Sequence, residues 1–326
     1  MKVLFFAPET GDADAWRVSL ARVLPDADIR VWRPGDTAYA DYAIVWRPPR
    51  ELFTAREGLK AVFNLGAGVD AILRFEREAP GTLSPDVPLI RLEDTGMAAQ
   101  MNEYAAYAVL RYLRRFDEYE LMQRSGEPHW HVLDPHPRET FVVAVLGLGV
   151  LGTQVARTLA SFGLPVRGYS RSLKTLDGIE TFASDAAPGA AAPGAAALDA
   201  CLEGARVVVN LLPSTPETEG VLNRRTFGRL ARGAYLVNLA RGAHVVEEDL
   251  LDALHEGRIA AATLDVFREE PLPAGHRFWR EPRVTITPHI SAQTLREPAA
   301  QQIAAKIAAL SRGEAVSGIV DVARGY

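Results

Sequence analysis

Short apolar runs alternate with helical patterns along most of the chain, which predicts an α/β fold with mostly parallel sheets. The runs fall into two groups, separated by a long helical pattern and a polar stretch, and we expect each group to form one sheet. The predicted strands of the first group are Lys2–Ala7, Asp28–Trp32, Tyr42–Trp46, Ala61–Asn64 and Leu89–Arg91. Those of the second group are Phe141–Leu146, Pro165–Tyr169, Val207–Leu212, Ala234–Asn238, Ala261–Asp265 and Val284–Thr287.

Two segments show the periodicity of amphipathic helices. The first begins near Ala99, and the apolar residues on one of its faces are Tyr104, Ala108, Leu110, Leu113 and Phe116. The second, Glu297–Leu310, carries an apolar stripe and is followed by Gly313, a helix stop signal. A low-complexity segment, residues 185–200, contains APGAA twice and is predicted to be a surface loop that runs into a helix.

Composition narrows the classes of protein. A chain of 326 residues predicts two domains, because one core usually serves roughly 150 residues. Apolar residues make up 48% and charged residues 24%, as in soluble globular proteins. The net charge of −5 argues against a nucleic-acid partner, and no apolar run approaches the roughly 18 residues of a membrane helix. The single cysteine, Cys201, excludes an internal disulfide and predicts a reducing, cytoplasmic location and an unreactive buried thiol.

A glycine-rich turn marks a candidate dinucleotide site. Gly147, Gly149 and Gly152 form G-x-G-x-x-G directly after the buried run FVVAVL and at the start of a helical pattern. In such a site the first glycine permits the tight turn, the second lets a pyrophosphate approach, and the third lets helix and strand pack. The intervening Val150 and Leu151 belong to the same predicted loop. Because strand, glycines and helix all agree, we interpret this segment as cofactor-binding.

The end of the next predicted strand indicates which cofactor is bound. An NAD site usually has Asp or Glu there, whereas this chain has Ser170, Arg171 and Ser172, with Lys174 beyond. An arginine pairs with the 2′-phosphate of NADP(H), and hydroxyls add donors, whereas a carboxylate would repel it. We therefore predict that NADP(H) is preferred and that NAD(H) is possible. The alternative is that Arg171 and Lys174 are only solvated surface charges.

Three side chains near the ends of later strands suit the reduction of a 2-keto acid. Arg241 could hold a carboxylate with two parallel hydrogen bonds, and His289 could protonate a carbonyl oxygen. Glu270 could accept the other ring proton of His289 and raise its pKa, although Glu269 is equally plausible from chemistry alone. Alternatively, Arg241 forms a salt bridge at a helix start, His289 is structural and Glu270 is an exposed loop carboxylate.

Two further features leave their roles open. Asp265, at a predicted strand end, could hold the nicotinamide carboxamide or could cap a turn. His129, His131 and His136 cluster in HWHVLDPH, but no convincing set of further ligands accompanies them, so we predict a polar loop and no metal site.

The order and spacing of several motifs resemble the D-isomer-specific 2-hydroxyacid dehydrogenase family. These motifs are VLGLGVLG, NLLPSTPET, LVNLARGAHVVEEDLLDAL, LDVFREEPLP and TITPHI. The runs FNLGAGVDAI, RLEDTGM and VDVARGY further resemble the glyoxylate/hydroxypyruvate reductase branch of that family. The resemblance implies two Rossmann-like domains with parallel sheets. A dinucleotide-binding domain of residues 100–287 is inserted into a discontinuous substrate domain of residues 1–99 and 288–326.

The resemblance also implies roles for residues. It makes Arg241 the carboxylate anchor, His289 the acid/base and Glu270, rather than Glu269, its support. It implies that the cofactor groove is lined by Leu211, Pro213, Leu239 and Ala240. The substrate carboxylate would meet the backbone N–H groups of Ala67, Gly68 and Val69, which suit an anion-binding nest but equally suit a plain turn. Trp46 would close the pocket.

The expected activity is reduction of small 2-keto acids, such as glyoxylate and hydroxypyruvate, to 2-hydroxy acids. The resemblance also implies a homodimer, with the helix from Ala99 and the arm Gly126–Thr140 as contacts and Trp130 reaching the partner's substrate pocket. One alternative is a phosphoglycerate-, formate- or phosphite-type dehydrogenase, although such enzymes as a rule prefer NAD. A second is a dinucleotide-sensing, corepressor-like binding protein.

Overall fold

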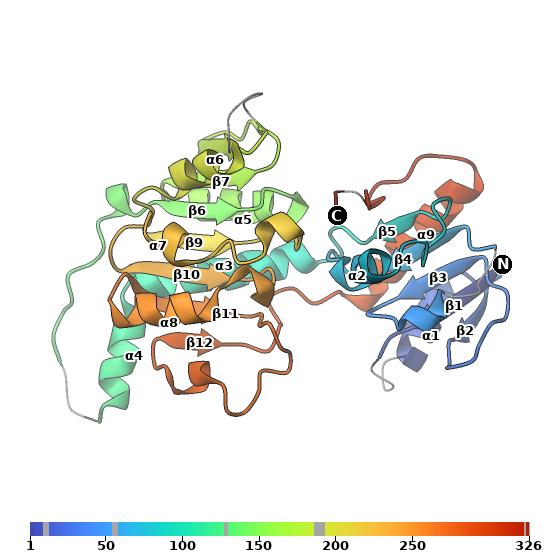
Figure 1. The fold of residues 1–326 in the computed structure, drawn as a ribbon, viewed down its shortest axis with the longest axis horizontal. Helices are drawn as coiled ribbons and strands as arrows, with labels where there is room; N and C mark the ends of the chain where they lie inside the picture. Colours follow the sequence, from blue (N-terminus) through green and yellow to red (C-terminus); the bar gives the residue numbers. More distant parts are fainter. Residues whose placement is uncertain (9–12, 54–57, 127–129, 186–192, 323, 326) are drawn as a thin grey trace. The chain divides into compact units, whose positions relative to one another are not determined.

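The chain divides into two compact units, and the first is built from both ends of the sequence (Figure 1). The computed structural model describes all residues except 9–12, 54–57, 127–129, 186–192, 323 and 326. Unit 1 comprises Met1–Met97 with Gln293–Tyr326, and unit 2 comprises Ala98–Ala292. Residues 288–292, which the sequence assigned to the substrate domain, therefore belong to unit 2. The N–H groups of Ile290 and Ser291 tie this segment to the Asp265 carboxylate of that unit.

Unit 1 contains a five-stranded parallel sheet in the order β2-β1-β3-β4-β5. Each strand agrees with a predicted run to within one residue. Because β2 lies on one side of β1 and the chain then continues on the other side, the order reverses between β1 and β3. The strands are β1 (Lys2–Phe6), β2 (Asp28–Val31), β3 (Tyr42–Val45), β4 (Ala61–Asn64) and β5 (Leu89–Arg91).

Helices cover both faces of this sheet. The apolar sides of α1 (Ala13–Val23) and α9 (Arg296–Ser311) pack on one face, where Ile303 and Ile307 of α9 are buried. On the other face, Ile72 and Leu73 of α2 (Asp70–Glu78) pack together with a short helix, η1 (Arg50–Leu52). The helix predicted over Glu297–Leu310 is thus present as α9.

Unit 2 contains a seven-stranded parallel sheet in the order β12-β11-β10-β9-β6-β7-β8. The strands are β6 (Val143–Leu146), β7 (Val166–Ser170), β8 (Ile179–Ala183), β9 (Val207–Asn210), β10 (Ala234–Asn238), β11 (Ile259–Leu264) and β12 (Val284–Ile286). The α/β class with two parallel sheets is confirmed. Strand β8 was not predicted, because this edge strand, IETFA, buries only its two end residues and lacks a continuous apolar run.

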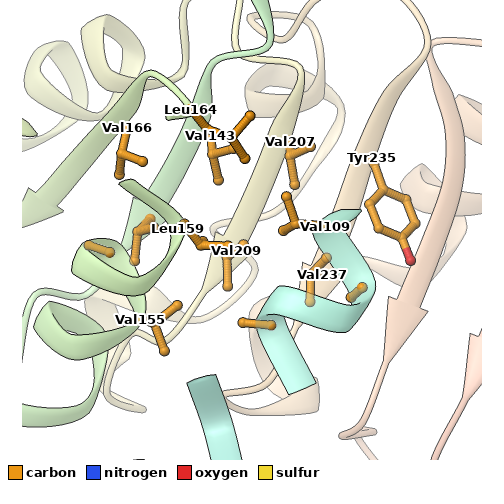
Figure 2. Packing of buried hydrophobic residues seen from close by; sticks show 14 of the residues in the cluster. Val109, Val143, Val155, Leu159, Leu164, Val166, Val207, Val209, Tyr235 and Val237 are labelled. Carbon is orange, nitrogen blue, oxygen red and sulfur yellow. The ribbon is translucent and has the colours of Figure 1, made fainter. Parts of the chain in front are cut away.

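The sheet of unit 2 is sandwiched between two helical layers. On one face, α3 (Met97–Leu113) and α5 (Val150–Ser161) pack on β6, β9 and β10, as Val109, Val155 and Leu159 show in Figure 2. The opposite face is covered by α6 (Pro193–Leu202), α7 (Arg224–Phe227) and α8 (Glu247–His255). Residues 186–192 of the low-complexity segment lie outside the described residues, and the segment then runs into α6. Among the described residues, no helix has the length and apolar character to cross a membrane.

The helical pattern that begins near Ala99 does not extend to Phe116. Helix α3 ends at Leu113, and Arg115 adopts a left-handed backbone with φ of 57°. A new helix, α4 (Phe116–Arg124), begins there, and the side chain of Phe116 is 48% exposed. Phe116 was therefore assigned wrongly to one face of the first helix, because a periodicity count does not detect the change of chain direction at Arg115. The described part of the unit also contains four 3₁₀ helices: η2 (Arg138–Thr140), η3 (Pro216–Thr218), η4 (Gly242–His244) and η5 (Arg277–Arg280).

A buried carboxyl group on α4 makes the stability of the protein depend on pH. Asp117 is 6% exposed, its Oδ1 has no hydrogen-bond partner among the described residues, and burial raises its pKa to about 6. A carboxyl group whose pKa is higher in the folded state stabilises the fold below its unfolded pKa. That contribution is lost as pH rises through the folded pKa.

Replacing Asp117 by asparagine is expected to raise the free energy of unfolding at about pH 8 by about 1–3 kcal/mol. At about pH 5 the gain should be roughly half as large, because there the folded wild type keeps most of its proton while the unfolded chain has already lost it. Denaturant titrations at the two pH values measure the difference. Asp14, in the first turn of α1 and 87% exposed, is the matched control, and Asp14→Asn should change little. A gain that is the same at both pH values would contradict the titration argument.

Candidate active site

The glycine-rich turn joins β6 to α5, and its three glycines have different surroundings. A Cβ on Gly147, whose φ is +100°, would lie 2.5 Å from the carbonyl oxygen of Leu211, and one on Gly152 would lie 1.8 Å from that of Gly147. The chain itself therefore requires both. A Cβ on Gly149, the N-cap of α5, would meet no described atom within 4 Å. The space beside Gly149 suits the approach of a phosphate to the positive end of the helix.

The loop after β7 carries the predicted cofactor-selecting residues. The Ser170 hydroxyl is nearly buried and donates to the carbonyl of Ser172, 2.8 Å away, so it faces its own loop. The Arg171 side chain is 38% exposed, and its Nε lies 4.0 Å from Asp185 Oδ2. Of this group, Arg171 and Lys174 are thus the charged side chains, and both are partly exposed in the loop after β7.

A buried polar network supports the turn that carries Arg241. Asn210, at the end of β9, donates from Nδ2 to Asn238 Oδ1, 2.9 Å away, and lies 2.9 Å from His244 Nδ1. Asn238, at the end of β10, donates from Nδ2 to the Arg241 carbonyl at 3.0 Å. These three supporting side chains are fully buried. Because each contributes to this buried hydrogen-bond network, the backbone of Arg241 is held in one conformation.

The Arg241 turn packs directly against the loop that carries Glu270. A Cβ added to Gly242 would lie 1.8 Å from the carbonyl carbon of Phe267, so only glycine allows this approach. Further along that loop, the Phe267 N–H donates to Glu270 Oε1 at 3.1 Å. The two loops therefore share a rigid contact, and a shift in one moves the other.

His289 and Glu270 form a hydrogen-bonded pair. His289 Nδ1 lies 2.9 Å from Glu270 Oε2, and both side chains are partly exposed, at 30% and 22%. Because a carboxylate only accepts, Nδ1–H donates, which leaves Nε2 as the ring atom that could exchange a proton with a substrate. The neighbouring Glu269 is exposed. The geometry thus distinguishes between two carboxyl groups that the sequence left equivalent.

Asp265 anchors the segment that carries His289. Its fully buried carboxylate accepts from the N–H of Ile290 at 2.9 Å, the N–H of Ser291 at 2.8 Å and the hydroxyl of Thr287 at 2.6 Å. His289 itself adopts a left-handed φ of 55°, and its N–H donates to the Asp265 carbonyl at 2.8 Å. These contacts match the turn-capping alternative. A strained backbone held by its surroundings is common at functional sites.

Tyr104, on α3, extends this anchor and was not predicted as a site residue. Its hydroxyl lies 2.5 Å from Thr287 Oγ1, and Thr287 already donates to Asp265, so Tyr104 is the donor. Burial raises the pKa of the Tyr104 phenol, which keeps that proton in place. A tyrosine on the inner face of a helix resembles any core aromatic in sequence, so only the fold identifies this contact.

The remaining predicted cofactor residues follow the carboxyl ends of β6, β9 and β10. Parallel α/β sheets bind ligands at this edge. Val150 and Leu151 begin α5 after β6, Leu211 and Pro213 follow β9, and Leu239 and Ala240 follow β10.

Unit 1 presents a loop of backbone N–H groups. Asn64, buried at the end of β4, donates from Nδ2 to the carbonyls of Gly66 at 3.0 Å and Gly68 at 2.9 Å. With these carbonyls turned inward, the N–H groups of Ala67, Gly68 and Val69 enter no hydrogen bond among the described residues. Such an arrangement suits an anion. The Trp46 ring packs on Gly66, where an added Cβ would lie 2.5 Å from Cζ3.

Two other candidate chemistries find little support. Burial raises the pKa of the Cys201 thiol to about 12, so it stays protonated and is not a nucleophile. In the described part of the chain, no cluster of three or more His, Cys, Asp or Glu side chains could hold a metal ion. His129, one of the three clustered histidines, lies outside the described residues.

Comparisons with known proteins match this geometry. The model of the family "D-isomer specific 2-hydroxyacid dehydrogenase, NAD binding domain" matches residues 106–291, which lie within unit 2. The chain is 56% identical to glyoxylate/hydroxypyruvate reductase A of Serratia proteamaculans (strain 568) over 326 residues, covering 100% of both chains. It is 52% identical over the same length to the protein of that name from Yersinia enterocolitica, again with 100% of both chains covered.

Two solved structures of relatives are also similar to this chain over its whole length. A D-isomer specific 2-hydroxyacid dehydrogenase from Xanthobacter autotrophicus Py2, in complex with NADPH and MES, is similar with a TM-score of 0.88 and 39% identity. An NADPH-dependent glyoxylate/hydroxypyruvate reductase from Sinorhizobium meliloti, in complex with NADP and sulfate, is similar with a TM-score of 0.87 and 33% identity. Both matches cover 100% of this chain and 99% of the other.

Proposed function

Because this chain belongs to the D-isomer-specific 2-hydroxyacid dehydrogenase family, in its glyoxylate/hydroxypyruvate reductase branch, we propose that it reduces small 2-keto acids with NADPH. Glyoxylate and hydroxypyruvate are the proposed substrates, and 2-hydroxy acids are the products. The observation that carries the proposal is the His289–Glu270 pair, which lies in the same unit as the dinucleotide turn. Unit 2 acts as the cofactor domain and unit 1 as the substrate domain.

Each side chain of the site has a separate role in the proposed reaction. NADPH, when bound along the glycine turn, supplies the hydride for the keto carbon. His289 delivers a proton from Nε2 to the keto oxygen, and Glu270 fixes the ring tautomer and stabilises the imidazolium form. Arg241 holds the substrate carboxylate with two parallel hydrogen bonds. The N–H groups of residues 67–69 provide further donors for that carboxylate.

Asp265 acts on this chemistry mainly through the backbone of His289. Both of its carboxylate oxygens are engaged by residues 287–291. A contact with the nicotinamide carboxamide remains part of the proposal, since a carboxylate oxygen can accept more than one hydrogen bond.

The test of this function is the loss of NADPH absorbance with glyoxylate, hydroxypyruvate and pyruvate, repeated with NADH. Reduction of glyoxylate or hydroxypyruvate, faster with NADPH, is the expected result. Tight cofactor binding without turnover of any keto acid would favour the corepressor-like alternative. Preference for NAD with phosphoglycerate, formate or phosphite would favour a different dehydrogenase.

Arg171 carries the proposed preference for NADPH. Arg171→Ala should raise the KM for NADPH about 10- to 100-fold and leave the KM for NADH nearly unchanged, because only NADPH carries the 2′-phosphate. Steady-state kinetics with each cofactor measures the split. Arg229, 47% exposed and paired with Asp199 at 3.1 Å, is the control, and Arg229→Ala should alter neither KM. Equal effects of Arg171→Ala on both cofactors would remove the assignment.

We also propose that the enzyme is a cytoplasmic homodimer. Several apolar side chains on α3, on α4 and on the arm before β6 are strongly exposed, which is unusual unless another surface covers them. They are Tyr107 at 63%, Phe116 at 48%, Trp130 at 102% and Val132 at 90%. Sedimentation velocity tests the proposal, and a monomer at micromolar concentration would oppose it.

A further inference from the structure

A second polar feature of unit 1 lies beside the loop of residues 66–69. The strand order of unit 1 reverses between β1 and β3, and ligands of such sheets bind at the carboxyl ends of the strands at this point. Val45, the last residue of β3, pairs with Phe6 of β1 and with Asn64 of β4. Trp46 and Arg47 follow Val45 directly. They therefore emerge at the switch point, beside the strand that leads into the N–H loop.

Arg47 occupies this position in a strained backbone conformation. Its φ is +42°, and among the described residues only Arg115 and His289 share a positive φ without being glycine. Its guanidinium lies 5.6 Å from the centroid of the Trp46 ring, and that ring packs on Gly66. The Arg47 side chain is exposed. An exposed cation on a strained backbone, stacked on an aromatic ring at a ligand-binding edge, points to recognition rather than to packing.

We propose that Arg47 forms a second anion subsite, which binds the distal carboxylate of 2-keto dicarboxylic acids. The inference rests on the proposed function, because it assigns the far end of the same substrate. The N–H groups of residues 67–69 hold the carboxylate next to the keto group. Arg47, at the end of the neighbouring strand, then meets an anionic group at the other end of a short substrate. A guanidinium pairs with a carboxylate bidentately, which gives orientation as well as affinity.

The chemistry of the reaction is unchanged by this subsite. The keto carbon gains a hydride and the keto oxygen gains a proton, while the distal carboxylate forms no covalent bond. Arg47 therefore selects among substrates and takes no part in bond making. A change at Arg47 should act on one class of substrate and spare the others.

The experiment compares oxaloacetate with pyruvate, which differ by one carboxylate on the methyl carbon, and uses glyoxylate as the reference. In the wild type we expect kcat/KM for oxaloacetate to exceed that for pyruvate. In Arg47→Gln, kcat/KM for oxaloacetate should fall about 10- to 100-fold, and the values for pyruvate and glyoxylate should change less than about threefold. Arg47→Lys should fall between wild type and Arg47→Gln for oxaloacetate, because it keeps the charge without the fork.

Two further variants separate recognition from folding. Arg74, on α2, is exposed and has its guanidinium 5.9 Å from the Phe75 ring centroid, so Arg74→Gln removes an equally stacked charge and should leave all three substrates unaffected. Arg47→Gly relieves the left-handed backbone, so it should melt no lower than wild type and still lose oxaloacetate reduction. Equal losses on all three substrates in Arg47→Gln, or no loss on oxaloacetate, would overturn the subsite. Reduction of glyoxylate without oxaloacetate would overturn it and leave the proposed function standing, whereas inactivity on every keto acid would end both.

Discussion

Replacing His289 by asparagine is expected to lower kcat for glyoxylate reduction by about 100- to 10,000-fold, because the reaction loses its proposed proton donor. Asparagine suits the test because, among residues other than glycine that lack an acidic proton, it tolerates the left-handed φ of 55° best. The variant should therefore fold. The KM for NADPH should stay within about threefold of wild type, since the glycine turn and Arg171 are untouched. Steady-state kinetics with a cofactor titration checks both values.

The chain supplies a matched control for this result. His276 Nε2 lies 3.2 Å from Glu247 Oε2, so unit 2 contains a second His–Glu pair. His276→Asn should leave kcat unchanged, because that pair serves the helix boundary of η5 and α8. Glu270→Gln should lie between wild type and His289→Asn, since the histidine remains but its imidazolium loses an anionic partner. A His289→Asn enzyme with wild-type kcat would exclude the proposed acid.

Replacing Arg241 by glutamine is expected to lower kcat/KM for glyoxylate by about 100- to 10,000-fold, because the two charge-assisted hydrogen bonds proposed to hold the carboxylate are lost. The KM for NADPH should change little. Arg241→Lys should recover only part of the loss, since an ammonium cannot form the planar fork. The polar network around Asn238 should keep the turn folded in both variants, because it contacts the backbone carbonyl of Arg241 rather than its side chain.

Arg277 is the control for the loss of one positive charge from unit 2. It is 63% exposed and pairs with Glu248 at 2.5 Å, on the surface near η5. Arg277→Gln should keep wild-type kcat/KM for glyoxylate. If Arg241→Gln instead raised the KM for NADPH and spared the keto acid, Arg241 would belong to the cofactor site and the proposed carboxylate anchor would be wrong.

The sequence predicted most strands well because buried parallel strands are continuous apolar runs. The strand VVVN of β9 is buried at all four positions, and such a continuous apolar run predicts a strand directly. Strand β8 was not predicted, because an edge strand with polar positions has no continuous apolar run. Phe116 was misassigned because periodicity does not register a change of chain direction at one left-handed residue, Arg115.

In the candidate site, too, some residues could be predicted from the sequence and others could not. Arg241, Glu270 and His289 could be predicted as candidate catalytic residues because each follows an apolar run that forms a parallel strand. The choice between Glu269 and Glu270 needed coordinates or a family pattern, since adjacent carboxylates have the same chemistry. Tyr104 could not be found, because its contact with Thr287 spans 183 residues of sequence. The Asn210–His244 contact likewise joins the end of β9 to η4, across 34 residues of sequence.

The proposed reacting groups are unequally shared between the two units. The glycine turn, Arg171, Arg241, Glu270 and His289 all belong to Ala98–Ala292, whereas Trp46, Arg47 and the N–H loop belong to the other unit. The proposed hydride chemistry and the proposed subsite for the distal carboxylate are thus encoded by separate stretches of the polypeptide. Transplanting residues 1–97 together with residues 293–326 from a relative offers a route to altered substrate scope with the hydride chemistry kept intact. Varying only the residues that follow β3, such as Trp46 and Arg47, tests the same change of substrate scope with fewer substitutions.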